Sequence, residues 1–199
     1  MIEAGHFIAI HGIDGTGKST LVQQVQHGLI RAGVTTHNAE VLLATASNPY
    51  REQREMFKGL DSQSRLYYSL GSKAVDQHVI SETLAQGESV VKDRWVIDVL
   101  ADQTHKGARA PRGVLGSLLK PNLAVVLRCS EAERQARIAA RGNATREDLI
   151  PNYPGTRAHY FEQYLLDNIA ESADRHIILD TTDATPNEVA DLVIESVIE

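Results

Sequence analysis

The chain has 199 residues, 42% of them hydrophobic and 23% charged, and its formal net charge is −6. This length allows one domain with a substantial core but not two large ones. The acidic balance argues against a nucleic-acid binder or a membrane-surface binder, because both need an excess of basic residues. The single cysteine, Cys129, excludes an internal disulfide and fits a reducing, cytoplasmic setting. No apolar run approaches the roughly 18 to 20 residues that a membrane-spanning helix needs.

The first part of the chain alternates short apolar runs with stretches of helical periodicity. Residues 7–10 form an apolar run that ends at a glycine-rich turn, which predicts a buried parallel strand. Residues 19–32 carry apolar side chains at helical spacing and end at a glycine, as a helix does. A second strand is expected at residues 40–43. Residues 47–54, around Pro49, are typical of a loop.

The middle of the chain continues this alternation. Residues 64–85 predict a long helix that ends before a glycine, and residues 89–92 predict a third strand. Residues 123–127, Leu-Ala-Val-Val-Leu, form the clearest strand pattern in the chain. The charged residues 131–141 are expected to form a helix that stops at a glycine.

The last part of the chain completes an α/β pattern. Residues 143–156 contain prolines and a glycine, and they predict an excursion from the core. A helix is expected over residues 157–172, a fifth strand at residues 176–179, and a closing helix over residues 186–198. Strands that alternate with helices imply a five-stranded parallel sheet covered by helices on both faces, a three-layer sandwich.

Residues 12–19, Gly-Ile-Asp-Gly-Thr-Gly-Lys-Ser, match the phosphate-binding pattern G-x-x-x-x-G-K-[ST]. The pattern lies between a predicted strand and a predicted helix, which is its confirming context. Glycines let the backbone wrap around phosphate oxygens, and the helix N-terminus attracts negative charge. Lys18 is expected to contact the β- and γ-phosphates of ATP, and the Ser19 hydroxyl to bind Mg²⁺. The expected nucleotide contacts are Gly12, Asp14, Gly15, Thr16, Gly17, Lys18, Ser19 and Thr20.

Features outside this pattern favour a kinase over other nucleotide-binding classes. The Asn-Lys-x-Asp motif with which Ras-type GTPases read their base is absent from the sequence. The extra glycine of the loop, Gly15, is common among small-molecule kinases.

Two sequence blocks resemble the thymidylate kinase family. Residues 7–21, FIAIHGIDGTGKSTL, are similar to its opening FIxFEGIDGxGKST, and residues 87–103, GESVVKDRWVIDVLADQ, are similar to its GxxVxxDRYxxSSLAYQ. Residues 137–142, RIAARG, resemble the R-I-x-x-R-G segment that leads into the family's lid. The resemblance covers nearly the whole chain and is weak between residues 34 and 63. It implies a P-loop kinase fold and ATP-dependent phosphoryl transfer to a nucleoside monophosphate.

The resemblance also implies roles for the acceptor side of the site. Asp93 would hold Mg²⁺ together with Ser19, and its neighbour Arg94 would bind the acceptor phosphate. Asp14 would accept a hydrogen bond from the 3′-hydroxyl of the acceptor sugar. Arg51, in Asn-Pro-Tyr-Arg, resembles the arginine of an F-P-x-R loop that binds the acceptor phosphate. The alternatives are a structural ion pair at the end of the strand and an aspartate that only caps a turn.

Arg54, one turn beyond Arg51, is a second candidate for the acceptor phosphate. Tyr68 falls where the family has an aromatic residue that stacks on the base, and such stacking tolerates different bases. Ser72 replaces the arginine that reads the base, with Lys73 beside it, and the family's glutamine is retained as Gln103.

Three further residues depart from the family pattern. Asp98 replaces a small hydroxyl residue and Asp102 replaces a tyrosine, and we expect both to line the acceptor pocket. Two carboxylates would make that pocket an acceptor of hydrogen bonds, which suits a base with amino groups better than thymine. Alternatively, these carboxylates face solvent or pair with Lys106 or Arg109. His11 stands at an acidic or apolar position of the family, and we expect it to pack in the interior or beside the site.

Four arginines, Arg134, Arg137, Arg141 and Arg146, cluster around residues 143–145. Such charges often only solvate a helix surface. Near a γ-phosphate, however, arginine stabilises the charge of the transition state. Because Arg137 and Arg141 lie four apart on one helix face, we expect these two to be the catalytic phosphate contacts.

The segment at residues 141–157 is expected to form the lid, with Pro151 and Pro154 stiffening it. Arg157 and Tyr160 resemble the R-x-x-Y that follows the lid in the family, and we expect them to contact the acceptor. Closure of a lid excludes water and so prevents wasteful hydrolysis of ATP.

Two other functions stay open from the sequence alone. A kinase for a nucleoside or another small hydroxyl metabolite would use the same donor loop, and a non-enzymatic regulator could bind ATP without transferring its phosphate. The resemblance also implies a possible homodimer formed through helices that flank the sheet.

Overall fold

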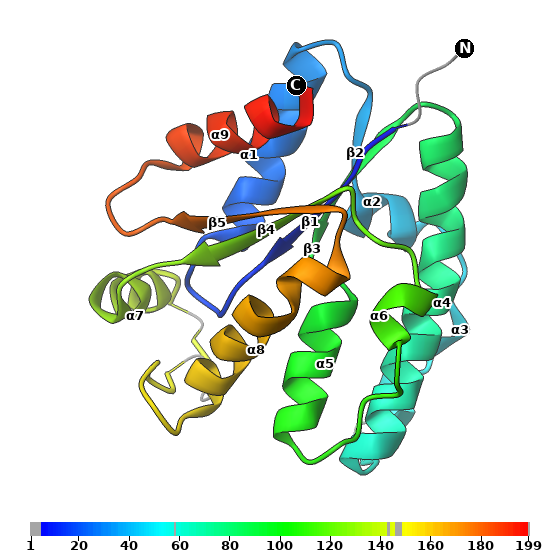
Figure 1. The fold of residues 1–199 in the computed structure, drawn as a ribbon, viewed down its shortest axis with the longest axis vertical. Helices are drawn as coiled ribbons and strands as arrows, with labels where there is room; N and C mark the ends of the chain where they lie inside the picture. Colours follow the sequence, from blue (N-terminus) through cyan, green and yellow to red (C-terminus); the bar gives the residue numbers. More distant parts are fainter. Residues whose placement is uncertain (1–4, 58, 143, 146–148, 199) are drawn as a thin grey trace.

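The computed structural model describes residues 5–57, 59–142, 144–145 and 149–198. Five parallel strands form one sheet in the order β2-β3-β1-β4-β5, which confirms the predicted five-stranded parallel sheet (Figure 1). The strands are β1 (Phe7–His11), β2 (Thr36–Asn38), β3 (Ser89–Asp93), β4 (Leu123–Arg128) and β5 (Arg175–Asp180). Ile10 lies opposite Asp93 of β3 and Val125 of β4, so the carboxyl ends of the three central strands meet at one edge.

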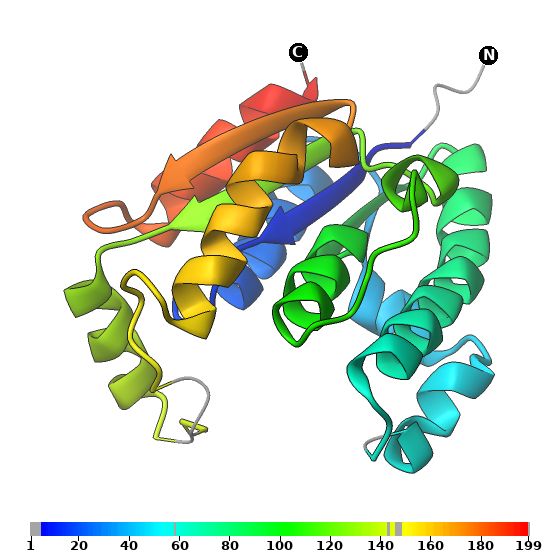
Figure 2. The ribbon, with the colours of Figure 1, turned by 60° about the horizontal axis from the view of Figure 1, so that its bottom comes forward.

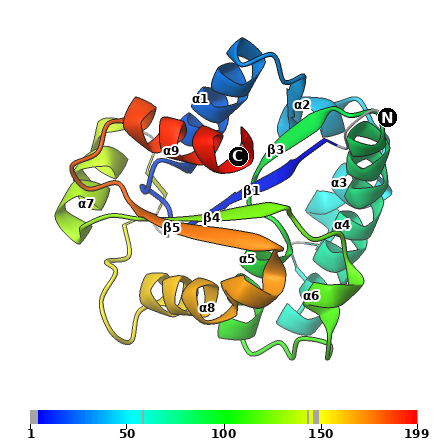
Figure 3. The ribbon, with the colours of Figure 1, turned by 45° about the horizontal axis from the view of Figure 1, so that its top comes forward.

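Helices cover both faces of the sheet, as Figures 1 and 3 show: α1 and α9 lie on one face, and α5 and α8 on the other. The helices are α1 (Lys18–Arg31), α2 (Ala39–Ala44), α3 (Pro49–Glu52), α4 (Ser62–Ala85), α5 (Val96–His105), α6 (Val114–Ser117), α7 (Glu131–Ala140), α8 (Arg157–Ser172) and α9 (Pro186–Ile198), with a 3₁₀ turn at Arg54–Phe57. Within the described residues, no helix is both long enough and apolar enough to cross a membrane.

Alternate residues of β1 feed two separate cores, because successive side chains of a strand point to opposite faces. Ile8 and Ile10 pack into the cluster that contains Val25 of α1. Phe7 and Ala9 pack into the cluster on the opposite face. All five residues of β1 are buried, as expected for a central strand of a parallel sheet.

The second strand lies earlier in the chain than the sequence predicted. β2 is Thr36–Asn38, and the apolar run expected as a strand forms the helix α2. Asn38 begins this helix, because its side chain accepts a hydrogen bond from the backbone N–H of Glu40. The expected loop after it contains α3, which Asn48 caps and Pro49 begins. The helices α5 and α6 were not predicted.

The point at which the strand order reverses marks the functional edge. β1 connects through α1 toward the β2 side, whereas β4 connects toward β5, so the connections diverge between these neighbouring strands. Open parallel sheets bind ligands beyond the carboxyl ends of their strands at such a point. Figure 2 shows α7 at this end of the sheet, with α3 and the start of α4 on the opposite side of the molecule.

Candidate functional site

The loop between β1 and α1 has the backbone that its glycines permit. Gly12, Gly15 and Gly17 have φ angles of 143°, 93° and 97°, in a region that residues with a Cβ rarely adopt. A Cβ on Gly12 would lie 2.7 Å from the carbonyl oxygen of Leu127, so β4 approaches the loop too closely for any side chain. Gly17 is the N-cap of α1, so the N-terminus of this helix faces the loop. The loop therefore has the shape of a phosphate cradle.

Lys18 is folded back onto this loop. Its Nζ donates a hydrogen bond to the carbonyl oxygen of Ile13 at 3.0 Å and lies 3.7 Å from Oδ1 of Asp14. Burial lowers the pKa of the ammonium group to about 8, and the positive charge of Arg94 acts in the same direction. A bound phosphate would supply the negative charge that the buried ammonium group needs.

Ser19 and Asp93 offer oxygen ligands at the first turn of α1. The Ser19 hydroxyl donates to Oδ2 of Asp93 at 3.0 Å, and Oδ1 of Asp93 is buried without a hydrogen-bond partner among the described residues. No group of three or more His, Cys, Asp or Glu side chains that could hold a metal occurs in the described ranges. One hydroxyl and one carboxylate fit Mg²⁺, which takes its other ligands from phosphates and water.

Arg94 and Asp14 form an ion pair across the mouth of the loop. Nη2 of Arg94 lies 2.5 Å from Oδ1 of Asp14, and the guanidinium lies 5.3 Å from the ring centre of Phe161. Burial raises the pKa of Asp14, but the charges of Lys18, Arg94 and Arg157 outweigh it and leave this pKa below its usual value.

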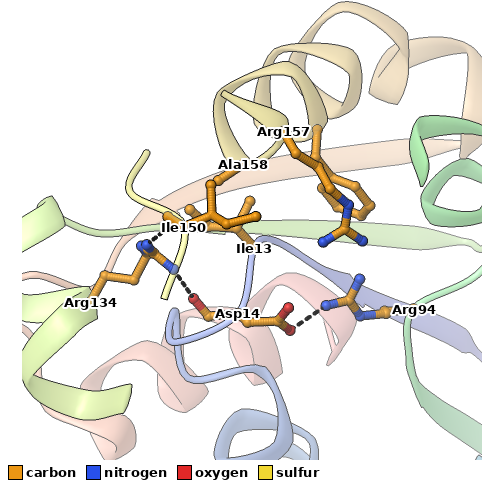
Figure 4. Close-up of a pocket in the computed structure, with 8 residues that line it drawn as sticks. Ile13, Asp14, Arg94, Arg134, Ile150, Arg157 and Ala158 are labelled. Carbon is orange, nitrogen blue, oxygen red and sulfur yellow. Dashed lines mark hydrogen bonds and ion pairs between the residues drawn. The ribbon is translucent and has the colours of Figure 1, made fainter. Parts of the chain in front are cut away.

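Figure 4 shows the guanidinium groups of Arg94 and Arg157 near each other on one side of Asp14, at one small cavity, with Arg134 on the other side of Asp14. Nη2 of Arg157 also pairs with Asp102 at 2.7 Å. Arg94 and Arg157 are each paired with a carboxylate, and an anionic phosphate can enter by displacing the Asp14 carboxylate from Arg94.

A larger cavity of about 490 Å³ lies between the phosphate loop, α7 and the segment after β5. Thr16, Gly17, Thr20, Arg137 and Arg141 all contribute to its lining. This cavity opens directly onto the phosphate loop, so it can accommodate the nucleoside of a donor nucleotide.

Arg137 is fixed in that cavity by three contacts. It pairs with Glu133 at 2.7 Å, donates to the Thr181 hydroxyl at 2.9 Å and donates to the Thr181 carbonyl oxygen at 2.5 Å. Arg141 lies exposed at the end of α7, and Arg146 lies outside the described residues. Sequence reasoning missed the segment from Thr181 to Pro186, because only its position after the last strand marks it.

A third cavity of about 320 Å³ lies between α4 and the segment that contains α2 and α3. Its lining residues are Glu40, Leu43, Arg51, Tyr68, Ser69, Ser72, Lys73, Asp76, Lys92 and Val99. Three residues expected on the acceptor side, Arg51, Tyr68 and Ser72, therefore come together here. The side chain of Arg54 lies outside the described part of the structure.

Asp76, which the sequence did not indicate, holds Arg51 in place. Its Oδ1 accepts from Nη2 of Arg51 at 2.9 Å and from the Asn48 side chain at 2.7 Å. Arg51 also donates to the carbonyl oxygen of Leu43, and Asn48 donates to the Ser72 hydroxyl at 3.3 Å. The network fixes Arg51 at the cavity wall, while the Ser72 hydroxyl is engaged as an acceptor.

Asp98 and Asp102 do not line the cavity that contains Tyr68. Asp98 is buried, and its Oδ2 lies 2.6 Å from Nδ1 of His11. Asp102 pairs with Lys106 at 2.8 Å, which is one of the alternatives expected for it, and accepts from Gln103 at 2.7 Å. The hydroxyl of Tyr160 lies 3.2 Å from the Thr104 hydroxyl.

Comparison with known proteins gives the family. A family model described as thymidylate kinase matches residues 10–192. The chain belongs to the thymidylate kinase family. It is 25% identical to a thymidylate kinase of Geobacter sulfurreducens, over 97% of this chain and 98% of that protein. It is also 25% identical to a probable thymidylate kinase of Pyrobaculum aerophilum, over 95% of this chain and 94% of that protein.

The fold agrees with this membership of the thymidylate kinase family. A solved thymidylate kinase of Candida albicans, described as having broad substrate specificity, superposes with a TM-score of 0.71. The alignment covers 98% of this chain and 92% of that one at 18% identity, so it shows the shared fold. Family members are nucleotide kinases, and the three cavities described above are the places where their two substrates can be sought.

Proposed function

We propose that this protein transfers the γ-phosphoryl group of ATP to the phosphate of a nucleoside monophosphate. The observation that carries the proposal is the position of Arg94, which stands at the mouth of the phosphate loop with a carboxylate as its exchangeable partner. Arg51 adds a second guanidinium, on the wall of the neighbouring cavity. A kinase that phosphorylates a free hydroxyl would leave both arginines without an acceptor phosphate to bind.

The chain's own residues supply positioning and charge neutralisation, which are the main needs of phosphoryl transfer. The loop backbone and Lys18 hold the donor phosphates, and Arg94 exchanges Asp14 for the acceptor phosphate. Arg137 and Arg141 line the donor cavity together with Gly17 of the loop, where they would stabilise the transferring group. Mg²⁺, held by Ser19 and Asp93, would neutralise charge on the donor phosphates.

The two carboxylates that line the acceptor cavity, Glu40 and Asp76, are paired with Lys92 and Arg51, which leaves Lys73 as a hydrogen-bond donor. Lys73 lines this cavity, with Nζ 5.0 Å from the ring centre of Trp95, and no hydrogen bond or ion pair to Lys73 occurs within the described residues. A donor here suits thymine or uracil, whose rings carry carbonyl groups and no amino group. This reverses the preference for amino-bearing bases that Asp98 and Asp102 suggested, because the structure pairs both carboxylates elsewhere.

A coupled assay of ADP release over the common ribo- and deoxyribonucleoside monophosphates tests the function. We expect turnover with a monophosphate whose base carries that carbonyl, and at least 100-fold less with the matching nucleoside, since a site that binds a phosphate rejects an acceptor lacking it. Equal turnover of the nucleoside would favour a nucleoside kinase. Slow ATP hydrolysis that no acceptor accelerates would favour a regulator.

Two further expectations come from the sequence, a homodimer from the family resemblance and a cytoplasmic location from the single cysteine. A homodimer stays a prediction, which light scattering coupled to size-exclusion chromatography checks by finding twice the mass of one chain. A cytoplasmic location also stays a prediction, which fractionation of the source cells checks.

A further inference from the structure

His11 and Asp98 both depart from the family pattern, and they meet in the interior. Nδ1 of His11 lies 2.6 Å from Oδ2 of Asp98, and the two side chains are only 1% and 4% exposed. The residues are 87 positions apart in the sequence. Each replaces a different family residue, and the two replacements contact each other, so the pair is a joint feature of this chain.

The pair ties the end of β1 to the start of α5. His11 is the last residue of β1, and Asp98 lies in the first turn of α5. Oδ2 of Asp98 also accepts the backbone N–H of Trp95, the N-cap residue, at 2.9 Å. Burial raises the pKa of Asp98, but the contact with His11, the positive charge of Arg94 and the hydrogen bond from the Trp95 N–H outweigh it, so the carboxyl group is ionised. A carboxylate only accepts hydrogen bonds, so Nδ1 of His11 carries the hydrogen.

The segment held in this way contains Arg94 in an unusual conformation. Arg94 has a φ of 63°, the only positive φ outside glycine in the described part of the chain. Such left-handed conformations persist where neighbouring contacts enforce them, often at functional sites. Here the Arg94 N–H donates to the Ile10 carbonyl oxygen at 2.9 Å, while the next N–H, that of Trp95, is held by Asp98. Both contacts lead back to the end of β1.

We propose that His11 and Asp98 are positioning residues that hold residues 93–95 so that the Arg94 guanidinium faces the acceptor phosphate. The inference rests on the proposed function, in which Arg94 binds that phosphate. Without the pair, the backbone of Arg94 relaxes toward an ordinary conformation and its side chain leaves the site. ATP binding depends on the phosphate loop instead, so the affinity for ATP is nearly unchanged.

Four single variants, and a double variant that combines His11→Ala with Asp98→Ser, test this inference. Asp98→Ser removes the carboxylate, and His11→Ala removes its donor. His11→Asn keeps an N–H near the position of Nδ1 and serves as the rescuing variant. Asp191→Asn, an exposed carboxylate change on α9, is the matched control. Kinetics are measured at saturating ATP and at saturating acceptor, together with the thermal unfolding midpoint.

We expect Asp98→Ser and His11→Ala to lower kcat/KM for the acceptor by about 10- to 100-fold, the range that a displacement near 1 Å produces. KM for ATP should change by less than about 3-fold, and His11→Asn should recover most of the loss. The double variant should be no worse than Asp98→Ser alone, because the two residues act as one unit. Equal losses toward both substrates, or a lowered unfolding midpoint with unchanged kinetics, would overturn the inference.

Trp95 gives a readout that does not depend on turnover, because it is the only tryptophan of the chain and belongs to the positioned segment. We expect its emission maximum to shift in Asp98→Ser and His11→Ala but not in His11→Asn or Asp191→Asn. Wild-type protein that phosphorylates no monophosphate would refute the proposed function alone. In that event, unshifted emission in the first two variants would refute the positioning role as well.

Discussion

The ammonium group of Lys18 is expected to set the upper pH limit of ATP binding by the free enzyme. Its pKa is lowered to about 8 by burial, and only the protonated form attracts a triphosphate. We therefore expect kcat/KM for ATP to be constant below pH 8 and to fall as the pH rises through about 8. Bound phosphates stabilise the ammonium ion, so the fall of kcat at alkaline pH should occur at a higher pH than the fall of kcat/KM.

Lys18→Arg separates this group from others that titrate nearby. Arginine stays charged throughout the assay range, so the variant should be slower but should lose the alkaline limb of kcat/KM for ATP. A limb that persists in Lys18→Arg would belong to another group. Lys73 is the first candidate, because burial lowers its pKa to about 8 as well.

Lys73 provides the second prediction at the residue scale. Lys73→Met keeps the length and the apolar contact with Trp95 but removes the donor. We expect KM for the preferred monophosphate to rise about 10-fold, which is the usual effect of losing one hydrogen bond to a charged donor. The differences in kcat/KM between monophosphates with different bases should become smaller, which a substrate panel would measure. Lys120→Met, which lines none of the three cavities, is the control.

At the scale of elements, α7 is joined to the phosphate loop through Arg134. This arginine is 2% exposed, pairs with Glu131 at 2.7 Å, and donates to the carbonyl oxygens of Asp14 and Ile150 at 3.1 and 2.6 Å. A Cβ on Gly15 would lie 2.7 Å from Cγ of Arg134, so the loop and the helix are in close contact. Arg134 therefore connects the loop, the helix and the segment before α8.

Arg134→Met should destabilise the protein by about 1 to 2 kcal/mol, because it removes the ion pair with Glu131 and the hydrogen bonds to the carbonyl oxygens of Asp14 and Ile150. KM for ATP should rise together with this loss, since the loop loses its support. Urea denaturation and initial rates check both effects. Arg112→Met, an exposed arginine, should change neither, and a wild-type urea midpoint in Arg134→Met would contradict the connecting role.

Elements with a strong periodic pattern were predictable, and short elements governed by capping were not. α8 and α9 begin and end where the sequence predicted, because proline and helical spacing mark them. The run after Asn38 contains Val41, Leu42 and Leu43, which are as typical of a strand as of a helix. The Asn38 cap stabilises the helical conformation of this run. The position of the strand follows only from the pairing of β2 with β3 at the edge of the sheet.

At the scale of the whole molecule, the site combines segments that only the strand order brings together. The phosphate loop was predictable because each of its residue types has a chemical reason within one short segment. The contact of Thr181 with the Thr16 carbonyl oxygen at 3.1 Å spans 165 positions, and no local pattern announces it. The same holds for His11 with Asp98, so the sequence revealed their unusual identities but not their contact.

The arrangement of the cavities also predicts the kinetic order of the reaction. The donor cavity borders Gly17, the acceptor cavity borders Arg51, and Arg94 and Asp14 line the small cavity at the mouth of the phosphate loop. With the donor and acceptor cavities assigned as proposed, both nucleotides would be bound at once with their phosphates adjacent, and the chemistry would need no covalent intermediate on the protein. We expect double-reciprocal plots that intersect when both substrates are varied.

An exchange experiment distinguishes this direct transfer from a two-step route. Labelled ADP should not exchange into ATP until the acceptor monophosphate is added, because no phosphoryl group is stored on the chain between substrates. Parallel double-reciprocal plots, together with exchange in the absence of acceptor, would contradict direct transfer. Lys18→Met should abolish both turnover and any exchange, which shows that the signal comes from the phosphate loop and not from a contaminating kinase.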